Sequence, residues 1–484
     1  MELTLIRKIK QQSSHRPAVI TDGGKSYTYG QLLDGVYALS AVQEPRTLVF
    51  CLCSNTIGSL MGYLACLFAG AVPLLLDRRL DSDMLKALMR RYQPSGLWVP
   101  CEMAQSILSG YHTAAKREGY VFLITGNPRY TIHPDLALLL TTSGSTGSPK
   151  LVRQSMKNIT ANAVSIAKYL KLDHSERPVT TLPMHYTYGL SVLHSHLFAG
   201  GTLLLTDRSV MEQEFWDYFE AYGATSLAGV PATYDILNRV GFFERELPTL
   251  RYFTQAGGKL SLSMHQKCAA FAKQKRLRFY AMYGQTEATA RMAYLPWQKS
   301  LEKCGSIGVP IPGGSFSLID ENENEIEIAG KTGELVYRGD NVTLGYAEEP
   351  ADLARGDERH GVLHTGDLAR KDEDGYYYIV GRLKRFLKMA GNRVNLDECE
   401  QMVTEAFPTA ECACCGTDDR LRVFVTLDES RLDDVKRELS GKLRLPLSSV
   451  SVLHLSEIPR SSAGKILYPQ LEAEKPGLHI LQNV

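Results

Sequence analysis

The segment that decides the fold class is Thr47–Leu76, which reads TLVFCLCSNTIGSLMGYLACLFAGAVPLLL. It begins and ends with apolar runs, Thr47–Cys53 and Ala71–Leu76, that are typical of strands buried on both faces. Between them, Asn55–Ala69 has the length of a helix, and Ser54-Asn55-Thr56 supplies residue types preferred at a helix N-terminus. The segment therefore predicts a strand, a helix and a second strand, the start of an α/β domain.

A membrane span is the alternative interpretation of this segment, because it contains no charged residue and is long enough to cross a bilayer. A continuous helix would tolerate Gly70 and Pro73 poorly, and the Ser54-Asn55-Thr56 triplet would lie in its middle. We therefore expect no membrane span. Because Met1–Lys8 meets a charge before an apolar run can form, we expect no secretory signal either.

Composition narrows the possible functions. The 484 residues leave room for roughly three domains, and the shares of hydrophobic (44%) and charged (22%) residues are those of an ordinary soluble globular protein. Lys and Arg number 54 against 53 Asp and Glu, so no large field of one sign is available to hold nucleic acid. Ten cysteines are too sparse for a disulfide scaffold, which predicts a reducing, cytoplasmic compartment.

The pattern of apolar runs, helical segments and turn residues changes along the chain. Short apolar runs alternate with helical patterns in the first half, as in Leu136–Leu140, Gly201–Leu205 and Leu277–Tyr283, which predicts a mostly parallel sheet. After about Gly305, turns and alternating strands such as Gly333–Gly339 predict an antiparallel or barrel-like subdomain. We expect a large domain over residues 1–380 and a small α+β domain over 381–484, the latter with helices at Leu396–Phe407 and Arg431–Leu443 and a strand at Leu421–Leu427.

A loop suited to phosphate follows the strand at Leu136–Leu140. Residues Leu140–Lys150 read LTTSGSTGSPK, and their small hydroxyl side chains, backbone N–H groups and one lysine can surround phosphate oxygens. Only two residues separate Gly144 from Gly147, and Pro149 precedes the lysine, so the loop is not a P-loop. A stretch of this composition on its own would more often be a flexible linker.

Six further motifs accompany this loop in order along the chain. They are Tyr283-Gly284-Gln285-Thr286-Glu287, Gly333-Glu334-Leu335 with Gly345-Tyr346, Thr365-Gly366-Asp367, Gly381-Arg382-Leu383-Lys384, Lys388 with Gly391, and Gly464-Lys465. From about Ser26 to Tyr468 the chain resembles the superfamily of adenylate-forming enzymes, which includes acyl-CoA synthetases, aryl-acid ligases, firefly luciferase and the adenylation domains of nonribosomal peptide synthetases. The resemblance implies a large N-terminal AMP-binding domain with α/β sheets and a β-rich subdomain, followed by a small mobile α+β domain.

The resemblance also implies a reaction. A carboxylate attacks the α-phosphate of ATP, with Mg²⁺ present, and forms an acyl-adenylate and pyrophosphate; a thiol then displaces AMP. Because two anions must be brought together, catalysis depends mainly on neutralising charge and on positioning. The family motifs place the nucleotide against the following residues: Thr142, Ser143, Gly144, Ser145, Thr146, Gly147, Lys150, Gly257, Gly258, Tyr283, Gly284, Asp367 and Arg382.

Individual roles follow from the same resemblance. Glu287 is implied as the magnesium ligand and Thr286 as a partner of the α-phosphate, an arrangement that suits Mg²⁺ held by one carboxylate and substrate phosphates. Tyr283 would stack on adenine, with Gly257 and Gly258 passing close to the base. Asp367 would bind the ribose hydroxyls, with Arg382 near the ribose and phosphate.

The small domain carries the remaining implied roles. Lys465 would bridge the substrate carboxylate and the phosphate during adenylation. Lys384 occupies the pivot position of the hinge in relatives. Lys388 and Gly391 would face the thiol channel once the small domain has turned.

The pocket for the acid is less sharply defined. The segment around Gly189 departs from the family pattern, because the usual histidine position is Tyr186 and His185 precedes it. His185 could equally be a structural histidine. An α-amino acid would need a carboxylate near Thr187, which is uncharged, and a buried ammonium without a partner is costly. An aryl or fatty acid is favoured by the apolar and aromatic character of Tyr186, Tyr188 and Val230, although these residues could simply pack the sheet.

The thiol acceptor stays open between CoA and the phosphopantetheine arm of a carrier protein acting in trans. The main hypothesis is a stand-alone acid–thiol ligase. An amino-acid:carrier ligase or an adenylate-forming oxygenase is the second, and a non-catalytic nucleotide-binding relative is the third. The third predicts damaged motifs, whereas Lys150, Glu287, Asp367, Arg382 and Lys465 are all present.

Overall fold

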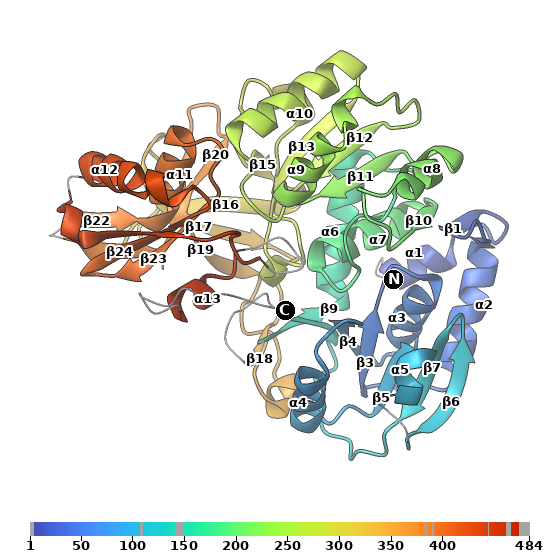
Figure 1. Ribbon diagram of the computed structural model, residues 1–484. Coiled ribbons are helices and arrows are strands. Elements are labelled where there is room, and N and C mark those ends of the chain that lie inside the picture. The colour runs from blue at the N-terminus through green and yellow to red at the C-terminus, as the bar shows by residue number, and fades with distance from the viewer. Residues whose placement is uncertain are drawn as a thin grey trace. The chain divides into compact units, whose positions relative to one another are not determined.

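The computed structural model of the protein describes residues 4–106, 110–141, 150–383, 385–389, 392–443, 445–460 and 466–473 (Figure 1). The chain divides into two compact units. The described residues of the first lie within 1–142, 148–316 and 337–363, and those of the second lie within 317–336 and 364–484. The boundary near residue 380, predicted from the change in sequence pattern, stays a prediction, and the implied hinge residue Lys384 lies outside the described residues.

The first unit contains an eight-stranded sheet. Its strand order is β18 (Gly345–Ala347), β9 (Leu151–Ser155), β8 (Leu136–Thr141), β4 (Val72–Asp77), β3 (Leu48–Cys53), β5 (Gly96–Pro100), β7 (Tyr120–Ile124) and β6 (His112–Arg117). The strands β8, β4, β3 and β5 are parallel, and the strands on either side of them are antiparallel. The mostly parallel sheet that the sequence predicts is therefore its centre, extended at both edges.

The segment that decides the fold forms β3, the helix α3 (Ile57–Ala69) and β4, as predicted. Thr56 caps the helix by accepting a hydrogen bond from the backbone N–H of Ser59, and Gly70 ends it in the left-handed conformation with φ 73°. All six residues of β3 are buried. Pro73 is accommodated within β4 and not within a helix.

A second sheet in the first unit has the order β11 (Ser226–Gly229), β12 (Tyr252–Gln255), β13 (Arg278–Tyr283), β14 (Ala293–Tyr294) and β15 (Val309–Pro310). Its first three strands are parallel, with α9 (Pro231–Arg239) after β11 and α10 (Leu262–Lys275) before β13. The predicted strand Gly201–Leu205 is the shorter β10 (Leu203–Leu205), and it pairs with β1 (Pro17–Thr21) beside β2 (Ser26–Thr28).

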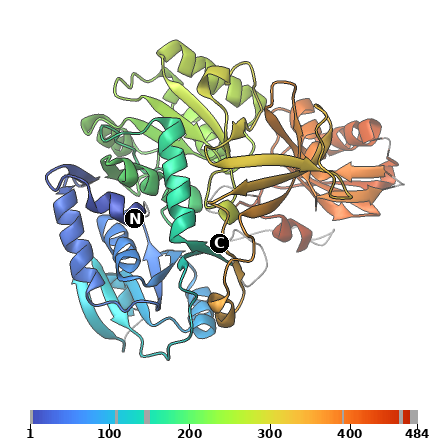
Figure 2. The same ribbon diagram turned by 180° about the vertical axis from the view of Figure 1, so that it is seen from behind.

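Two helices, α6 (Met156–Leu170) and α7 (Thr187–Ala199), lie between these two larger sheets (Figure 2). Ile159 of α6 and Leu193 of α7 belong to the apolar cluster that includes β3 and β4. Tyr169 and Tyr188, from the same two helices, belong to the cluster that includes β12 and β13. The remaining helices of this unit are α1 (Leu5–Lys10), α2 (Tyr29–Ser40), α4 (Ser82–Tyr92), α5 (Cys101–Ser106) and α8 (Gln213–Ala221).

The predicted β-rich region is a four-stranded sheet in the order β16 (Gly314–Ile319), β17 (Thr332–Gly339), β19 (Val362–Lys371) and β20 (Tyr377–Arg382). The C-terminal α+β region contains the hairpin β21 (Phe386–Met389) and β22 (Asn392–Asn395), and a sheet of β23 (Cys412–Thr417), β24 (Arg420–Val425) and β25 (Val450–His454). The helices α11 (Leu396–Ala406) and α12 (Leu432–Leu443) pack on that sheet, and α13 (Tyr468–Ala473) follows it. These elements agree with the predicted helices and strand.

Within the described part of the chain, no helix combines the length and the apolar character that crossing a membrane requires.

Candidate active site

The turn after β13 carries the motif Tyr283–Glu287 and is held tightly. A Cβ atom at Gly284 would overlap the backbone carbonyl of Ala290, so only glycine allows this approach. Thr286 and Glu287 lie in a short 3₁₀ turn, residues Thr286–Ala288. The amide of Asn341 donates to the carbonyl of Ala288 at 2.8 Å and so fixes the segment that follows the motif.

The carboxylate of Glu287 meets a phenol from a distant strand. Tyr346 of β18 donates its hydroxyl to Oε1 of Glu287 at 2.6 Å. Burial, reinforced by the negative charge of Glu287, raises the pKa of Tyr346 to about 12, so this hydroxyl remains a donor at neutral pH. No other described residue donates a hydrogen bond to this carboxylate, which leaves Oε2 available to a ligand.

Two cations lie over the ring of Tyr346. The guanidinium of Arg359 is 4.7 Å from the ring centroid, and Nζ of Lys150 is 5.7 Å from it. Arg359 also donates to the backbone carbonyl of Glu287 at 3.1 Å and to the hydroxyl of Thr343 at 2.8 Å. Three parts of the chain that are far apart in sequence, at residue 150, residue 287 and residues 346–359, therefore meet at one phenol.

Strand register explains the position of the motif lysine. In the antiparallel pair of β18 and β9, Ala347 lies opposite Leu151. The next position along each strand puts Lys150 beside Glu348, and the two side chains form an ion pair of 2.6 Å. The sequence does not predict this pairing, because β9 and β18 are almost two hundred residues apart.

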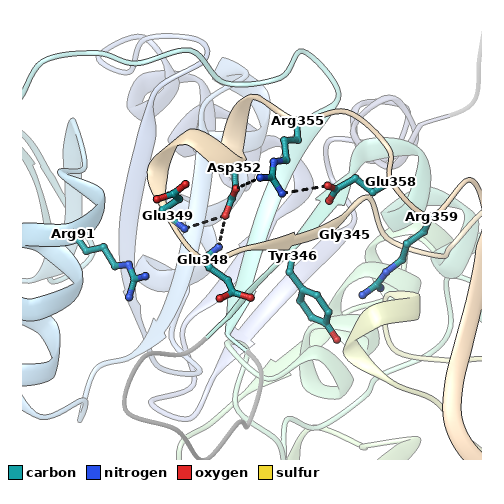
Figure 3. A pocket seen from close by; sticks show the side chains of 9 residues that line it. All are labelled: Arg91, Gly345, Tyr346, Glu348, Glu349, Asp352, Arg355, Glu358 and Arg359. Carbon is teal, nitrogen blue, oxygen red and sulfur yellow. Dashed lines mark hydrogen bonds and ion pairs between the residues drawn. The ribbon is translucent and has the colours of Figure 1, made fainter.

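A cavity of about 630 Å³ opens beside this cluster (Figure 3). Its walls come from α4, β18 and the 3₁₀ turn Pro350–Ala354, and it is lined by Arg91, Gly345, Tyr346, Glu348, Glu349, Asp352, Arg355, Glu358 and Arg359. Both signs of charge line it, and Arg355 pairs with Asp352 at 3.1 Å and with Glu358 at 3.4 Å.

The predicted glycine turn lies against the predicted acid pocket. Gly257 has a φ of 84°, and a Cβ there would stand 2.6 Å from the hydroxyl of Tyr186 and 3.0 Å from Val230. The amide of Gln255 closes the turn by donating to the carbonyl of Gly258 at 2.8 Å. The structure therefore brings Gly257, Gly258, Tyr186 and Val230 together.

The start of α7 supplies the remaining pocket residues. Thr187 is the first residue of the helix, and Tyr186 precedes it as the N-cap. Tyr188 is buried, and its hydroxyl donates to the carbonyl of Thr254 in β12 at 3.0 Å. The rings of Tyr186 and Tyr188 meet edge to face, with centroids 6.4 Å apart.

His185 points toward a carboxylate of the large sheet. Its Nε2 lies 3.8 Å from Oδ2 of Asp77, which also pairs with Arg79. Burial lowers the pKa of His185, although the charge of Asp77 opposes the change, so the imidazole is neutral at pH 7. Its buried Nδ1 has no hydrogen-bond partner among the described residues, which leaves both the structural and the functional interpretation open.

In the second unit, Asp367 and Arg382 lie opposite each other in the β19–β20 pair. Nε of Arg382 is 3.2 Å from Oδ1 of Asp367, and the aspartate side chain is buried while the arginine is largely exposed. The sequence placed both residues at the ribose, and the structure puts them in direct contact.

The motif Gly333-Glu334-Leu335 holds the turn that carries Asp367. The carboxylate of Glu334 accepts a hydrogen bond from the backbone of Gly366 at 3.2 Å, and the carbonyl of Leu335 accepts one from Thr365 at 2.7 Å. The two motifs are thus parts of one structure, in which strand β17 positions the turn within β19.

Several predicted site residues lie outside the described residues: Thr142, Ser143, Gly144, Ser145, Thr146, Gly147, Lys384, Gly391 and Lys465. Lys388 lies in strand β21, but its side chain is not among those described. The roles implied for these residues stay predictions.

Two residues of the site had no predicted role. Arg359 holds the backbone of Glu287, and Asn341 holds the carbonyls of Ala288 and Arg291 at 2.8 and 2.9 Å. Neither belongs to a motif recognised in the sequence, and only the long-range contacts of the folded chain reveal them.

Comparison with known proteins agrees with this geometry. A sequence model described as AMP-binding enzyme matches residues 6–347. The 2-succinylbenzoate–CoA ligase of Bacillus licheniformis is 29% identical over 347 residues, which cover 70% of each chain. The long-chain-fatty-acid–CoA ligase of Escherichia coli O157:H7 is 30% identical over 361 residues, which cover 71% of this chain and 62% of that ligase.

Solved structures agree on the fold. The o-succinylbenzoate CoA synthetase of Bacillus subtilis, in complex with its acyl-adenylate intermediate, superposes with a TM-score of 0.78 over 98% of this chain and 99% of that one, at 21% identity. The predicted α/β architecture and the predicted class of enzyme, an acid–thiol ligase, are confirmed. The protein belongs to the AMP-binding enzyme family, the adenylate-forming superfamily that its motifs resemble.

Proposed function

We propose that this protein activates a carboxylic acid with ATP as an acyl-adenylate and then transfers the acyl group to the thiol of CoA. The convergence of Lys150, Glu287 and Arg359 on Tyr346 carries the proposal. It places two cations next to a carboxylate at the end of a parallel strand, where adenylation must neutralise triphosphate oxygens. The names of the relatives support CoA as the acceptor.

Magnesium fits the donor set around Glu287. Among the described residues, no group of three or more His, Cys, Asp or Glu side chains is arranged to hold a metal. A single carboxylate oxygen left without a protein donor suits Mg²⁺, which binds through one or two carboxylates with substrate phosphates and water. When bound, the ion would neutralise the phosphates; Tyr346 would orient the carboxylate that holds it.

We propose that Asp367 accepts hydrogen bonds from the ribose hydroxyls. Because Nε of Arg382 lies 3.2 Å from one of its oxygens, the carboxylate is held in one orientation. In the first unit, Tyr283 would stack on adenine and Thr286 would bond the α-phosphate. Lys465 would supply charge during adenylation, Lys384 would act as the hinge between 1–380 and 381–484, and Lys388 with Gly391 would face the thiol.

The proposed acid binds along Tyr186, Tyr188 and Val230, beside the Gly257 turn. These walls suit an aryl or alkyl body. Thr187 supplies no charge for an α-ammonium group, which disfavours an amino acid. All ten cysteines are free thiols, which supports action in a reducing compartment such as the cytoplasm.

Acid-dependent exchange of pyrophosphate into ATP tests the first half-reaction. The purified protein is offered a panel of aryl, alkyl and amino acids with Mg²⁺, and at least one aryl or alkyl acid is expected to drive exchange. The same acid is then supplied with CoA or with a phosphopantetheinylated carrier protein. Thioester on CoA supports the proposed acceptor, whereas thioester on the carrier alone would replace it, and acid-dependent oxygen consumption would indicate an oxygenase.

A further inference from the structure

Arg291 is a buried residue beside the nucleotide motif whose position is fixed by its backbone. Its carbonyl accepts hydrogen bonds from Asn162 and Asn341, both at 2.9 Å. The next residue, Met292, donates its N–H to the carbonyl of Tyr283 at 2.9 Å. A Cβ at Gly284 would stand 2.9 Å from the Cα of Arg291, so this arginine lies directly against the motif turn.

Arg291 is 2% exposed, and its guanidinium lies among aromatic and apolar side chains. Nη1 donates to the hydroxyl of Tyr169 at 2.9 Å and approaches the sulfur of Met282 at 3.0 Å. The ring of Tyr188 lies 4.7 Å away. All of these neighbours are neutral, and Nε has no hydrogen-bond partner among the described residues. No described carboxylate lies within ion-pair distance of it.

Arg153 is a buried arginine with a structural role, and it shows how this fold supplies hydrogen-bond acceptors to such a residue. It is also fully buried, but its Nε donates to the carbonyl of Tyr346 and its Nη1 to that of Arg355. Its Nη2 donates to Leu344 and forms an ion pair with Glu358. Every nitrogen of Arg153 has an acceptor, and one acceptor is charged. The Nε of Arg291 has no acceptor in the part of the chain that the structure describes, which is costly for a buried cation unless a ligand supplies one.

Arg291 is continuous with the predicted acid pocket. Tyr188 contacts its guanidinium and meets Tyr186 edge to face. Tyr186 in turn lies against the Gly257 turn. Burial raises the pKa of Tyr186 to about 12, and the nearby charge of Arg291 opposes that rise, which agrees with their proximity. A chain of contacts thus joins the glycine turn to the guanidinium.

We propose that the acid activated by this protein is a dicarboxylic acid, and that the unpaired Nε edge of Arg291 binds the carboxylate that does not react. This inference rests on the proposed function and narrows its substrate class. The aryl or alkyl body between the two carboxylates would lie along Tyr186, Tyr188 and Val230. Arginine suits this role, since its planar edge matches a carboxylate and it remains charged when buried.

Matched pairs of acids test the proposal. Dicarboxylic acids from malonate to sebacate, with phthalate and its isomers, are compared with their monomethyl esters by acid-dependent pyrophosphate exchange. For the preferred acid, kcat/KM is expected to exceed that of its monoester by at least about 10-fold, because a charge-assisted hydrogen bond is lost in the ester. Arg291→Met should bring the ratio close to one, and Arg291→Lys should keep part of the preference.

The ratio of kcat/KM for the diacid to kcat/KM for its monoester distinguishes a loss of specificity from a loss of folded protein. A loss of folded protein would lower both values by the same factor. Equal loss for diacid and monoester in Arg291→Met would overturn the proposal. A wild-type protein that prefers monoesters or fatty acids while exchanging well would also overturn it and would leave the proposed function intact. If no acid drives exchange, the proposed function fails, and this inference fails with it.

Discussion

The Tyr346 cluster in the first unit and the Asp367–Arg382 pair in the second are built differently. The cluster is assembled from three distant parts of the chain, and its geometry depends on the pairing of β9 with β18. The pair depends on one hairpin, whose register places Asp367 opposite Arg382. The two carboxylates also differ in their partners. One oxygen of Glu287 has no donor among the described residues, whereas Asp367 forms an ion pair with Arg382. The first arrangement suits binding of a cation or phosphate, and the second suits orientation of a hydrogen-bonding ligand.

Lys465, which is not among the described residues, provides a reference for this comparison because its implied role is confined to the first half-reaction. Lys465→Ala is expected to lower adenylate formation by about 10²- to 10³-fold, as removal of a charge-stabilising donor does in other enzymes. Thioester formation from supplied acyl-adenylate should be comparatively intact. Rapid-quench assays of the two half-reactions measure this difference, and equal loss in both steps would contradict domain alternation.

Removal of the Glu287 carboxylate should be the most damaging change within the Tyr346 cluster. Glu287→Ala is expected to slow pyrophosphate release by about 10²-fold, because a ligand to the charge-neutralising ion is lost. The concentration of Mg²⁺ needed for half-maximal rate should rise as well. An unchanged metal titration in the variant would remove Glu287 from the metal site.

Removal of the Asp367 carboxylate should act on nucleotide binding. Asp367→Ala is expected to raise the KM for ATP by about 10- to 100-fold, since hydrogen bonds to a charged group contribute about 1.5–3 kcal/mol. The Mg²⁺ titration should stay as in the wild type, in contrast to Glu287→Ala. The wild type should prefer ATP to 2′-deoxy-ATP and the variant should not; a preference that survives would place the ribose elsewhere.

The smallest effect is expected from the phenol that links the cluster. Tyr346→Phe removes the 2.6 Å hydrogen bond to Glu287 and retains the ring that Lys150 and Arg359 contact. A loss of about 1 kcal/mol corresponds to a roughly 5-fold lower kcat for exchange. Tyr29→Phe is the matched control, because that buried phenol donates to the carbonyl of Gly201 at 2.9 Å, and neither residue belongs to the Tyr346 cluster or lines the cavity beside it. Equal effects of the two substitutions would show that Tyr346 does not orient the carboxylate.

The sequence predicts best what is local. The β3–α3–β4 unit follows from apolar runs, an N-cap and a C-terminal glycine within thirty residues. The resemblance implies that Asp367 and Arg382 both lie near the ribose, but their register opposite each other in the β19–β20 hairpin was not predicted.

Long-range pairing is what sequence reasoning could not supply. Three interactions join segments that are more than fifty residues apart in sequence. They are the ion pair of Arg153 with Glu358, the hydrogen bond from Arg359 to the carbonyl of Glu287, and the hydrogen bond from Asn341 to the carbonyl of Ala288. No periodicity marks these contacts. Arg291 was missed for a related reason, because a lone arginine after a motif is ordinarily solvated, and only its burial without a charged partner singles it out.

The most direct test of the account is the nucleotide product that the purified protein forms from ATP, Mg²⁺ and a panel of mono- and dicarboxylic acids in the presence of CoA. The account predicts AMP and pyrophosphate, formed only when a suitable acid is present and in equal amount to the CoA thioester. Formation of ADP and phosphate, or no acid-dependent AMP with any member of the panel, would contradict it.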